Sequence, residues 1–289
     1  MPTARHNKHL LRGALLVIAA ELMFASMGAV IKGLSTDLPT EMLVFFRNAF
    51  GLLVLLPLLA RRGVPSLATR VPHLHLLRAL SGLSAMYCFF YALSELQLAN
   101  AVILKLTAPI FIPVIAAAWL REEISPGIVA AVVAGFVGVA LIVRPPGGHL
   151  DAVALIGLAG GALVALAKVT IRRLTRTEPA TRIVFYFGLV ATVVSVVPLA
   201  WAWRAPSPRE WAMLALLGVL ATSGQLLMTR GYASAPAARV GTFTYASVLF
   251  AAAYGWWFWG EQWDLWALTG AALIVVAGVL AVRRRRQAA

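Results

Sequence analysis

Ten blocks of about twenty mostly apolar residues follow one another along the 289-residue chain, separated by short polar segments. A helix of that length crosses the roughly 30 Å hydrocarbon core of a bilayer. Because 61% of the residues are hydrophobic and 12% charged, too little polar surface remains for soluble domains. The sequence therefore predicts an all-α polytopic membrane protein and excludes a soluble enzyme. The expected spans are 13–33, 42–60, 76–94, 99–120, 127–144, 153–172, 183–203, 211–230, 237–259 and 265–282.

Basic residues lie mainly at the ends of these blocks. With the N-terminus placed in the cytoplasm, 18 of the 25 Lys and Arg residues fall on the cytoplasmic side, 4 outside and 3 within spans. This is the bias of the positive-inside rule, and most tryptophans cluster at the outer span ends as an interfacial belt. We therefore expect both termini in the cytoplasm. The net charge of +14 is interpreted as membrane topology, with no nucleic-acid partner.

The basic start of the chain is followed by a long apolar block without a small-residue cleavage site, which predicts a first span instead of a cleaved signal. The lone cysteine, Cys88, rules out a disulfide framework within the chain.

The two halves of the chain show a weak internal repeat. The segment 25–34 aligns with 165–174, and 109–123 aligns with 247–261. Each half holds five expected spans, and an odd number requires the second copy to insert upside down. We therefore expect two inverted five-helix repeats, residues 1–147 and 148–289, which is a transporter architecture.

On these features the chain resembles the drug/metabolite transporter superfamily, in its ten-helix EamA-type branch. The resemblance covers the whole chain and rests on Phe46-Arg47-Asn48, on Tyr91-Ala92-Leu93, and on Pro109 followed by Glu123 and Ser125. It implies secondary transport of small metabolites, often export, through a central cavity between the repeats. The second repeat keeps Glu261 but has Ser247 in place of the proline, so the ninth span is expected to kink less.

Ionisable groups at membrane depth are candidates for function. Glu21 is the one carboxylate in the interior of an expected span, and it shares a helix face with small residues that suit a cavity wall. It either binds a substrate amine or a proton, or forms a structural ion pair with a basic side chain of a neighbouring helix. Arg47 and Lys105 are candidates to bind a substrate carboxylate, with snorkelling to the interface as the alternative.

Two prolines follow Lys105 at one-turn intervals. Pro109 and Pro113 are expected to bend the fourth span, and broken helices at membrane depth belong where they line a cavity. Lys168 and Arg78 lie near the inner span ends, where snorkelling is the favoured interpretation.

Polar residues also form stripes on other spans. Ser84 and Tyr91 belong to a stripe on the third span, and Gln225 to one on the eighth, where a buried amide must find partners. Tyr245, the repeat counterpart of Thr107, either forms an aromatic wall of the pocket or packs in the core. For Gln225 the alternative is hydrogen bonding between helices.

The sequence contains no zinc-protease motif, phosphate-binding Walker loop or nucleophile elbow, so no enzyme activity, catalytic residue, cofactor or metal site is expected. Transport must then be driven by a proton gradient or by exchange. We expect a secondary transporter, monomeric or homodimeric, that exports amino acids or related zwitterions from a bacterial inner membrane by alternating access.

Three alternatives remain open at this stage. An uptake permease for a metabolite or vitamin would use the same architecture. A multidrug or organic cation exporter is disfavoured, because basic groups outnumber acidic ones within the spans. An intramembrane enzyme or a non-transporting partner protein would need features that the sequence does not show.

Overall fold

The structure is a computed structural model that describes residues 2–60, 67–95, 106–143, 152–260 and 265–283. These residues form helices and no strand. The first half contains α1 (Pro2–Leu34), α2 (Thr40–Ala60), α3 (Pro72–Glu95), α5 (Ala108–Leu120) and α6 (Pro126–Val143). The second half contains α7 (Ala152–Leu174), α8 (Ala180–Ala202), α9 (Pro208–Ser234), α10 (Ala237–Val240), the 3-10 helix η2 (Gly241–Tyr245), α11 (Ala246–Trp259) and α12 (Leu265–Arg283).

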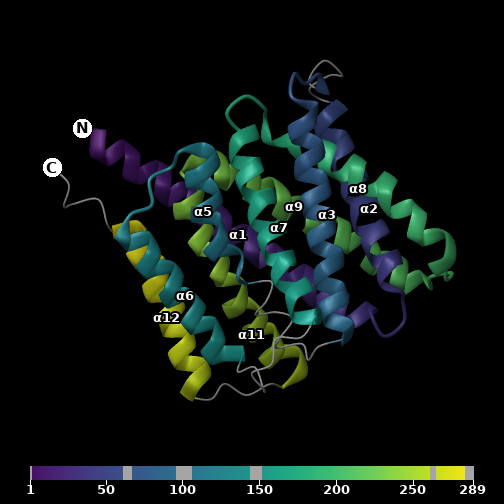
Figure 1. The fold of residues 1–289 in the computed structure, drawn as a ribbon. Helices are drawn as coiled ribbons and strands as arrows, with labels where there is room; N and C mark the ends of the chain where they lie inside the picture. Colours follow the sequence, from purple (N-terminus) through teal and green to yellow (C-terminus); the bar gives the residue numbers. More distant parts are fainter. Residues whose placement is uncertain (1, 61–66, 96–105, 144–151, 261–264, 284–289) are drawn as a thin grey trace.

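A helix occupies the place of each of the ten expected spans (Figure 1). Five helical segments are by themselves long and apolar enough to cross a membrane: His9–Leu34, Thr40–Ala60, Leu155–Leu174, Ala180–Ala202 and Pro208–Ser234. The segments Ala108–Leu120, Pro126–Gly138 and Leu268–Ala277 are apolar but shorter. The all-α membrane fold is thus confirmed, while residues 99–105 of the fourth expected span lie outside the described residues.

The packing of the helices follows a two-fold pattern. Helix α1 packs on α9 and α11, and its counterpart α7 packs on α3 and α5. Likewise α2 packs on α9 while α8 packs on α3, and the pairs α2–α8 and α6–α12 join counterparts directly. Exchanging every helix for its counterpart in the other half reproduces this set of contacts, as two inverted repeats require. The boundary expected between residues 147 and 148 lies outside the described residues.

Irregular backbone occurs at the same place in both repeats. Thr107 ends a turn and precedes the first residue of α5, and its expected counterpart Tyr245 ends η2 and precedes the first residue of α11. Pro109 lies in the first turn of α5, where a missing N–H leaves no hydrogen bond unmade. Pro109 therefore begins a helix in the described residues instead of bending one, while Pro113 lies inside α5 as expected.

The ninth span is interrupted, although it lacks the proline on which a kink was expected to depend. Near its start, between α10 and α11, lies the 3-10 segment η2, in which Thr242 Oγ1 donates to the carbonyl of Arg239. A Cβ on Gly241 would lie 2.9 Å from Ile112 Cδ1, so α5 passes close to the backbone here. Interrupted spans are typical of transporters.

Small residues bring several helices into close contact. A Cβ on Gly218 of α9 would lie 2.8 Å from the backbone nitrogen of Gly51 in α2. A Cβ on Gly138 of α6 would lie 2.6 Å from the carbonyl oxygen of Gly270 in α12. Glycine thus allows backbone-to-backbone packing between the repeats, as in many membrane bundles.

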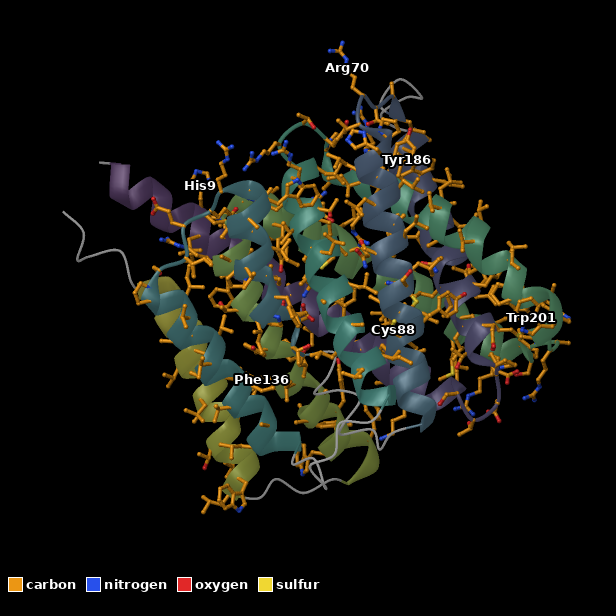
Figure 2. The ribbon with its side chains drawn as sticks, in the orientation of Figure 1. His9, Arg70, Cys88, Phe136, Tyr186 and Trp201 are labelled. Atoms are coloured by element: carbon orange, nitrogen blue, oxygen red, sulfur yellow. The ribbon has the colours of Figure 1, made fainter. Side chains whose placement is uncertain are left out.

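Side chains at the two ends of the bundle differ in kind. Figure 2 shows His9, Arg70 and Tyr186 toward one end, with Phe136 and the exposed Trp201 away from it. The end that carries His9 and Arg70 is the one expected to face the cytoplasm.

Candidate functional site

The first polar group of the interior joins three helices. Lys168 Nζ of α7 lies 3.4 Å from Glu21 Oε1 of α1 and donates to Thr244 Oγ1 of η2 at 2.8 Å. The exposed fractions of Glu21 and Lys168 are 5% and 6%. The interrupted segment of the ninth span is thereby bonded to a buried ion pair between the first helices of the two repeats.

The second polar group lies on α2, α3, α8 and α9. Arg78 Nη2 donates to Gln225 Oε1 at 2.8 Å, and Arg47 Nη1 donates to Asn48 Oδ1 at 2.7 Å. Both guanidinium groups lie over the ring of Phe187, with Cζ to ring-centroid distances of 4.1 Å for Arg78 and 5.7 Å for Arg47. Such cation–π contacts stabilise a buried cation only in part.

A small cavity of about 20 Å³ adjoins this second group, with space for a single water molecule. Its polar lining comes from α2 and α9, which belong to different repeats, while Phe187 and Gly188 of α8 close its side. The polar lining residues are Arg47, Asn48, Thr222 and Gln225.

Lys168 and Arg78 do not snorkel to the interface. Lys168 reaches toward the bundle centre because Glu21 and Thr244 offer an anion and a hydroxyl there. Arg78, with 3% of its surface exposed, finds an amide acceptor and an aromatic face. The sequence suggested an interface position because both residues lie within two turns of a helix end, and only packing between helices identifies their partners.

The candidate residues chosen from sequence have different outcomes. The structural ion pair considered for Glu21 exists, Arg47 lines the cavity, and Gln225 both lines the cavity and bonds to Arg78 between helices. Ser84 is exposed on α3, so the structure does not bring it to this cavity. Lys105 and the side chain of Tyr91 lie outside the described residues.

Tyr245 is a core residue instead of a wall of the cavity. It is fully buried, packs with Leu106, Val248 and Ile274, and donates from its hydroxyl to the carbonyl of Val132 at 3.3 Å. A Cβ on Gly135 would overlap its ring, so the glycine makes room for it. The core interpretation of Tyr245 is therefore the one that the packing supports.

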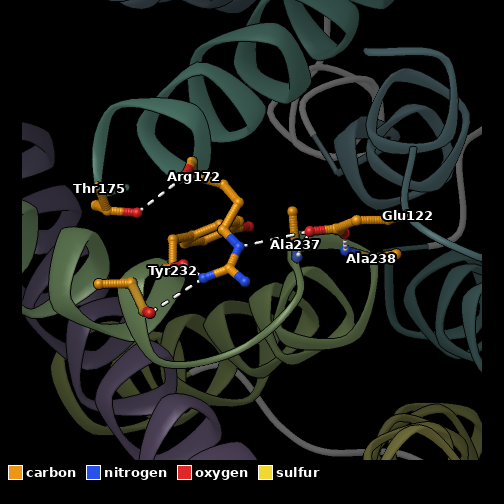
Figure 3. A network of polar contacts seen from close by, with 7 residues as sticks. Glu122, Arg172, Thr175, Tyr232, Ala237 and Ala238 are labelled. Carbon is orange, nitrogen blue, oxygen red and sulfur yellow. Dashed lines mark hydrogen bonds and ion pairs between the residues drawn. The ribbon is translucent and has the colours of Figure 1, made fainter. Parts of the chain in front are cut away.

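A third network joins the ends of four helices near the N-terminus of α10 (Figure 3). The carboxylate of Glu122 accepts hydrogen bonds from the backbone nitrogens of Ala237 and Ala238, at 3.2 and 3.3 Å, and lies 3.4 Å from Arg172 Nε. Arg172 Nη1 donates to the carbonyls of Tyr232 and Ala233 at the end of α9. One ion pair thus satisfies backbone groups at the end of one helix and the start of the next.

The sequence reasoning missed this network because it singled out the neighbouring Glu123, which is exposed. A signal was present, since Glu122 and Arg172 both follow long apolar runs and carry opposite charges. Nothing in either run indicates that the two meet.

The chemistry of the site is that of binding. Charged and amide groups from both repeats converge near a cavity, without a nucleophile–base pair among them. Within the described part of the chain, no group of three His, Cys, Asp or Glu side chains could hold a metal ion.

An inverted-repeat helical membrane fold with a charged centre defines a multi-pass transporter of small molecules, not an enzyme. The family model described as the EamA-like transporter family matches residues 11–144 and again residues 152–283. The chain therefore belongs to the EamA-like transporter family, whose members include multi-pass proteins of bacterial inner membranes.

Two named relatives and one solved structure resemble the chain over nearly its whole length. A Pseudomonas aeruginosa protein named pseudopaline exporter CntI is 35% identical over 277 residues, covering 95% of this chain and 97% of the relative. A Rhizobium johnstonii protein named riboflavin transporter is 28% identical, covering 94% and 91%. A crystal structure with 20% identity and a TM-score of 0.80 covers 93% of this chain and 96% of its own, and shows the same fold.

Proposed function

We propose that this protein exports amino acids or related zwitterionic metabolites by alternating access between its two repeats. The observation that carries the proposal is the arrangement of opposite charges in the bundle interior. Glu21 and Lys168 lie on the first helices of the two repeats, and Arg47 and Arg78 lie beside a cavity between α2 and α9. A molecule with both an amine and a carboxylate is complementary to such a set.

In this proposal, Glu21 receives the ammonium group of the substrate and Arg47 receives a carboxylate. Lys168 holds the Glu21 carboxylate in the described state, at a distance of 3.4 Å. The arriving amine would replace Lys168, whose ammonium group then keeps its bond to Thr244 in η2. Substrate binding would in this way act on the interrupted ninth span, which is a suitable element for a conformational change.

Export is favoured over uptake by the identity of the relatives, since the protein named as an exporter is 35% identical, whereas a Rickettsia bellii protein named S-adenosylmethionine uptake transporter is 26% identical. We propose cytoplasmic termini, because 18 of the 25 basic residues fall on that side of the expected topology. Since the sequence has no nucleotide-binding motif, a proton gradient or exchange supplies the driving force.

The first experiment measures thermal stability of the purified protein with single compounds at concentrations near 100 times Kd, where a ligand of the folded state stabilises by about 2.7 kcal/mol. The panel contains amino acids, an organic cation, riboflavin and S-adenosylmethionine. Amino acids are expected to raise the Tm, and Glu21→Gln is expected to abolish the rise. The matched control Glu123→Gln removes an exposed carboxylate and should respond like the wild type.

Stabilisation by riboflavin or by the organic cation alone would contradict the proposal. The direction of transport is tested with inside-out vesicles and a labelled amino acid that stabilises the purified protein. An exporter should accumulate this amino acid inside such vesicles. Accumulation only in right-side-out vesicles would favour uptake instead.

A further inference from the structure

Two buried guanidinium groups share one aromatic ring, with no counter-ion in the part of the chain that the structure describes. Arg47 and Arg78 have exposed fractions of 6% and 3%, and both lie over the ring of Phe187. Among the described residues, no carboxylate lies within 4.0 Å of either guanidinium group, whereas Lys168 has Glu21 at 3.4 Å. The pair therefore differs from Lys168 and His75, the other buried basic residues of the described part of the chain, which each lie within 4.0 Å of a carboxylate.

Arg78 also has hydrogen-bond donors that remain unused. Nη2 donates to Gln225, but the buried atoms Nε and Nη1 have no hydrogen-bond partner among the described residues. A buried donor without a partner costs about 1–3 kcal/mol, and more when it is charged. Native proteins rarely keep such groups without a reason.

The position of the pair supplies that reason. Arg47 and the Arg78 partner Gln225 both line the cavity between α2 and α9, and Asn48 and Thr222 add polar atoms to its wall. A guanidinium group offers a planar fork of N–H donors that matches the two oxygens of a carboxylate. Helix α9 belongs to the second repeat and α2 to the first, so a ligand here would contact both repeats.

We infer that Arg47 and Arg78 form a subsite for carboxylates, so that the exported molecule carries more carboxylates than amines. This inference rests on the proposed function and specifies its substrate class. Among the described residues, the buried charges away from the helix ends are those of Arg47, Arg78 and Lys168 against that of Glu21, while the buried Glu178 and Glu210 lie at helix ends. A simple amino acid has no net charge and leaves two positive charges unmatched at membrane depth, which is costly. An amino compound with additional carboxylates matches them.

The test compares three ligands that differ by one carboxylate at each step: glutamine, glutamate and N-(carboxymethyl)glutamate. Their dissociation constants are measured by titration calorimetry on the purified protein. A hydrogen-bonded carboxylate at a buried guanidinium is expected to improve affinity by about tenfold or more for each step. Equal affinity for the three compounds would overturn the subsite.

Arg78→Gln should remove at least one affinity step, so that the ratio of the dissociation constants of glutamine and N-(carboxymethyl)glutamate falls by about tenfold. Arg47→Gln should weaken all three ligands, because Arg47 receives the carboxylate that they share. The matched control Arg230→Gln removes an exposed positive charge from α9 and should keep both steps. If Arg230→Gln removes them as well, the effect is one of overall charge and the subsite is wrong.

A second variant remains informative even if the arginine variants fail to fold. Gln225→Glu places an internal carboxylate where Arg78 Nη2 now meets an amide oxygen. It should raise the Tm of the ligand-free protein and weaken N-(carboxymethyl)glutamate by about tenfold or more relative to glutamine. Unchanged discrimination in this variant would contradict the inference.

The two proposals fail in different ways. If none of the three ligands binds or is transported, the proposed function is wrong and the subsite falls with it. If all three bind with equal affinity and are exported, the function stands and the carboxylate subsite is wrong.

Discussion

Lys168 Nζ lies 3.4 Å from Glu21 Oε1, and the two residues come from the first helices of opposite repeats. Their side chains have exposed fractions of 8% and 6%. Because Lys168 also bonds to Thr244, this pair connects both halves of the bundle to the interrupted ninth span.

Removing one member of this pair should destabilise the protein more than removing both. Glu21→Gln or Lys168→Gln leaves an unmatched buried charge and should cost about 3–5 kcal/mol in the free energy of unfolding. The double variant leaves no such charge and should recover much of that loss. Unfolding of all four proteins in detergent gives the coupling energy, and simple additivity of the single effects would argue against the pair.

A methyl group at the contact of α9 with α2 should separate these helices. Gly218→Ala places its Cβ 2.4 Å from Phe50 Cβ and 2.8 Å from backbone atoms, so a loss of about 1–3 kcal/mol in stability is expected. Gly28→Ala is the control, because nothing lies within 4 Å of the added Cβ. Thermal denaturation should separate the two variants, and equal Tm values would contradict the close contact.

Much of the fold could be predicted from the sequence, because each apolar block indicates a membrane span independently of the other blocks. Block length gives the spans, and the odd number of spans in each half gives the inversion. The interior charges of Glu21 and Arg47 were also recognisable, since an ionisable residue in an apolar block stands out. The interruption at Gly241–Tyr245 could not be predicted, because no proline lies within this segment to mark it. In the structure the segment meets Ile112 of α5 and Lys168 of α7, both distant in sequence.

The partners in the site could not be predicted for a related reason. Which helices touch, and in which register, depends on packing between repeats distant in sequence. Gln225 and Arg78 are 147 residues apart, as are Lys168 and Glu21. A local sequence pattern shows which residues share a helix face, but not which residue of another helix lies opposite them. Lys168 and Arg78, near the ends of their spans, were therefore expected to snorkel to the membrane interface.

The carboxylate of Glu122 should matter more for stability than that of its neighbour. Glu122→Gln replaces a charged acceptor of two backbone N–H groups and of Arg172, and should cost about 1–3 kcal/mol. Glu123→Gln alters an exposed residue and should stay within about 0.5 kcal/mol of the wild type. Chemical unfolding of both proteins provides the comparison, and a reversed order would show that the network is dispensable.

Cysteine labelling should locate the two ends of the bundle. In a Cys88→Ser background, Thr177→Cys lies in the exposed connection of α7 with α8, and Ala205→Cys in that of α8 with α9. A membrane-impermeant maleimide should label Ala205→Cys in intact cells and Thr177→Cys only in inside-out vesicles, because basic residues favour the cytoplasmic side. The opposite pattern would contradict the proposed cytoplasmic position of both termini.

The 3-10 segment of the ninth span also has a mechanical consequence. A 3-10 helix rises about 2.0 Å and turns about 120° per residue, against about 1.5 Å and 100° in an α-helix. Rewinding the five residues Gly241–Tyr245 as α-helix would shorten the span by about 2.5 Å and rotate one end against the other by about 100°. Thr244 lies within this segment, so a change of winding alone could carry its hydroxyl away from Lys168 while both flanking helices keep their internal hydrogen bonds.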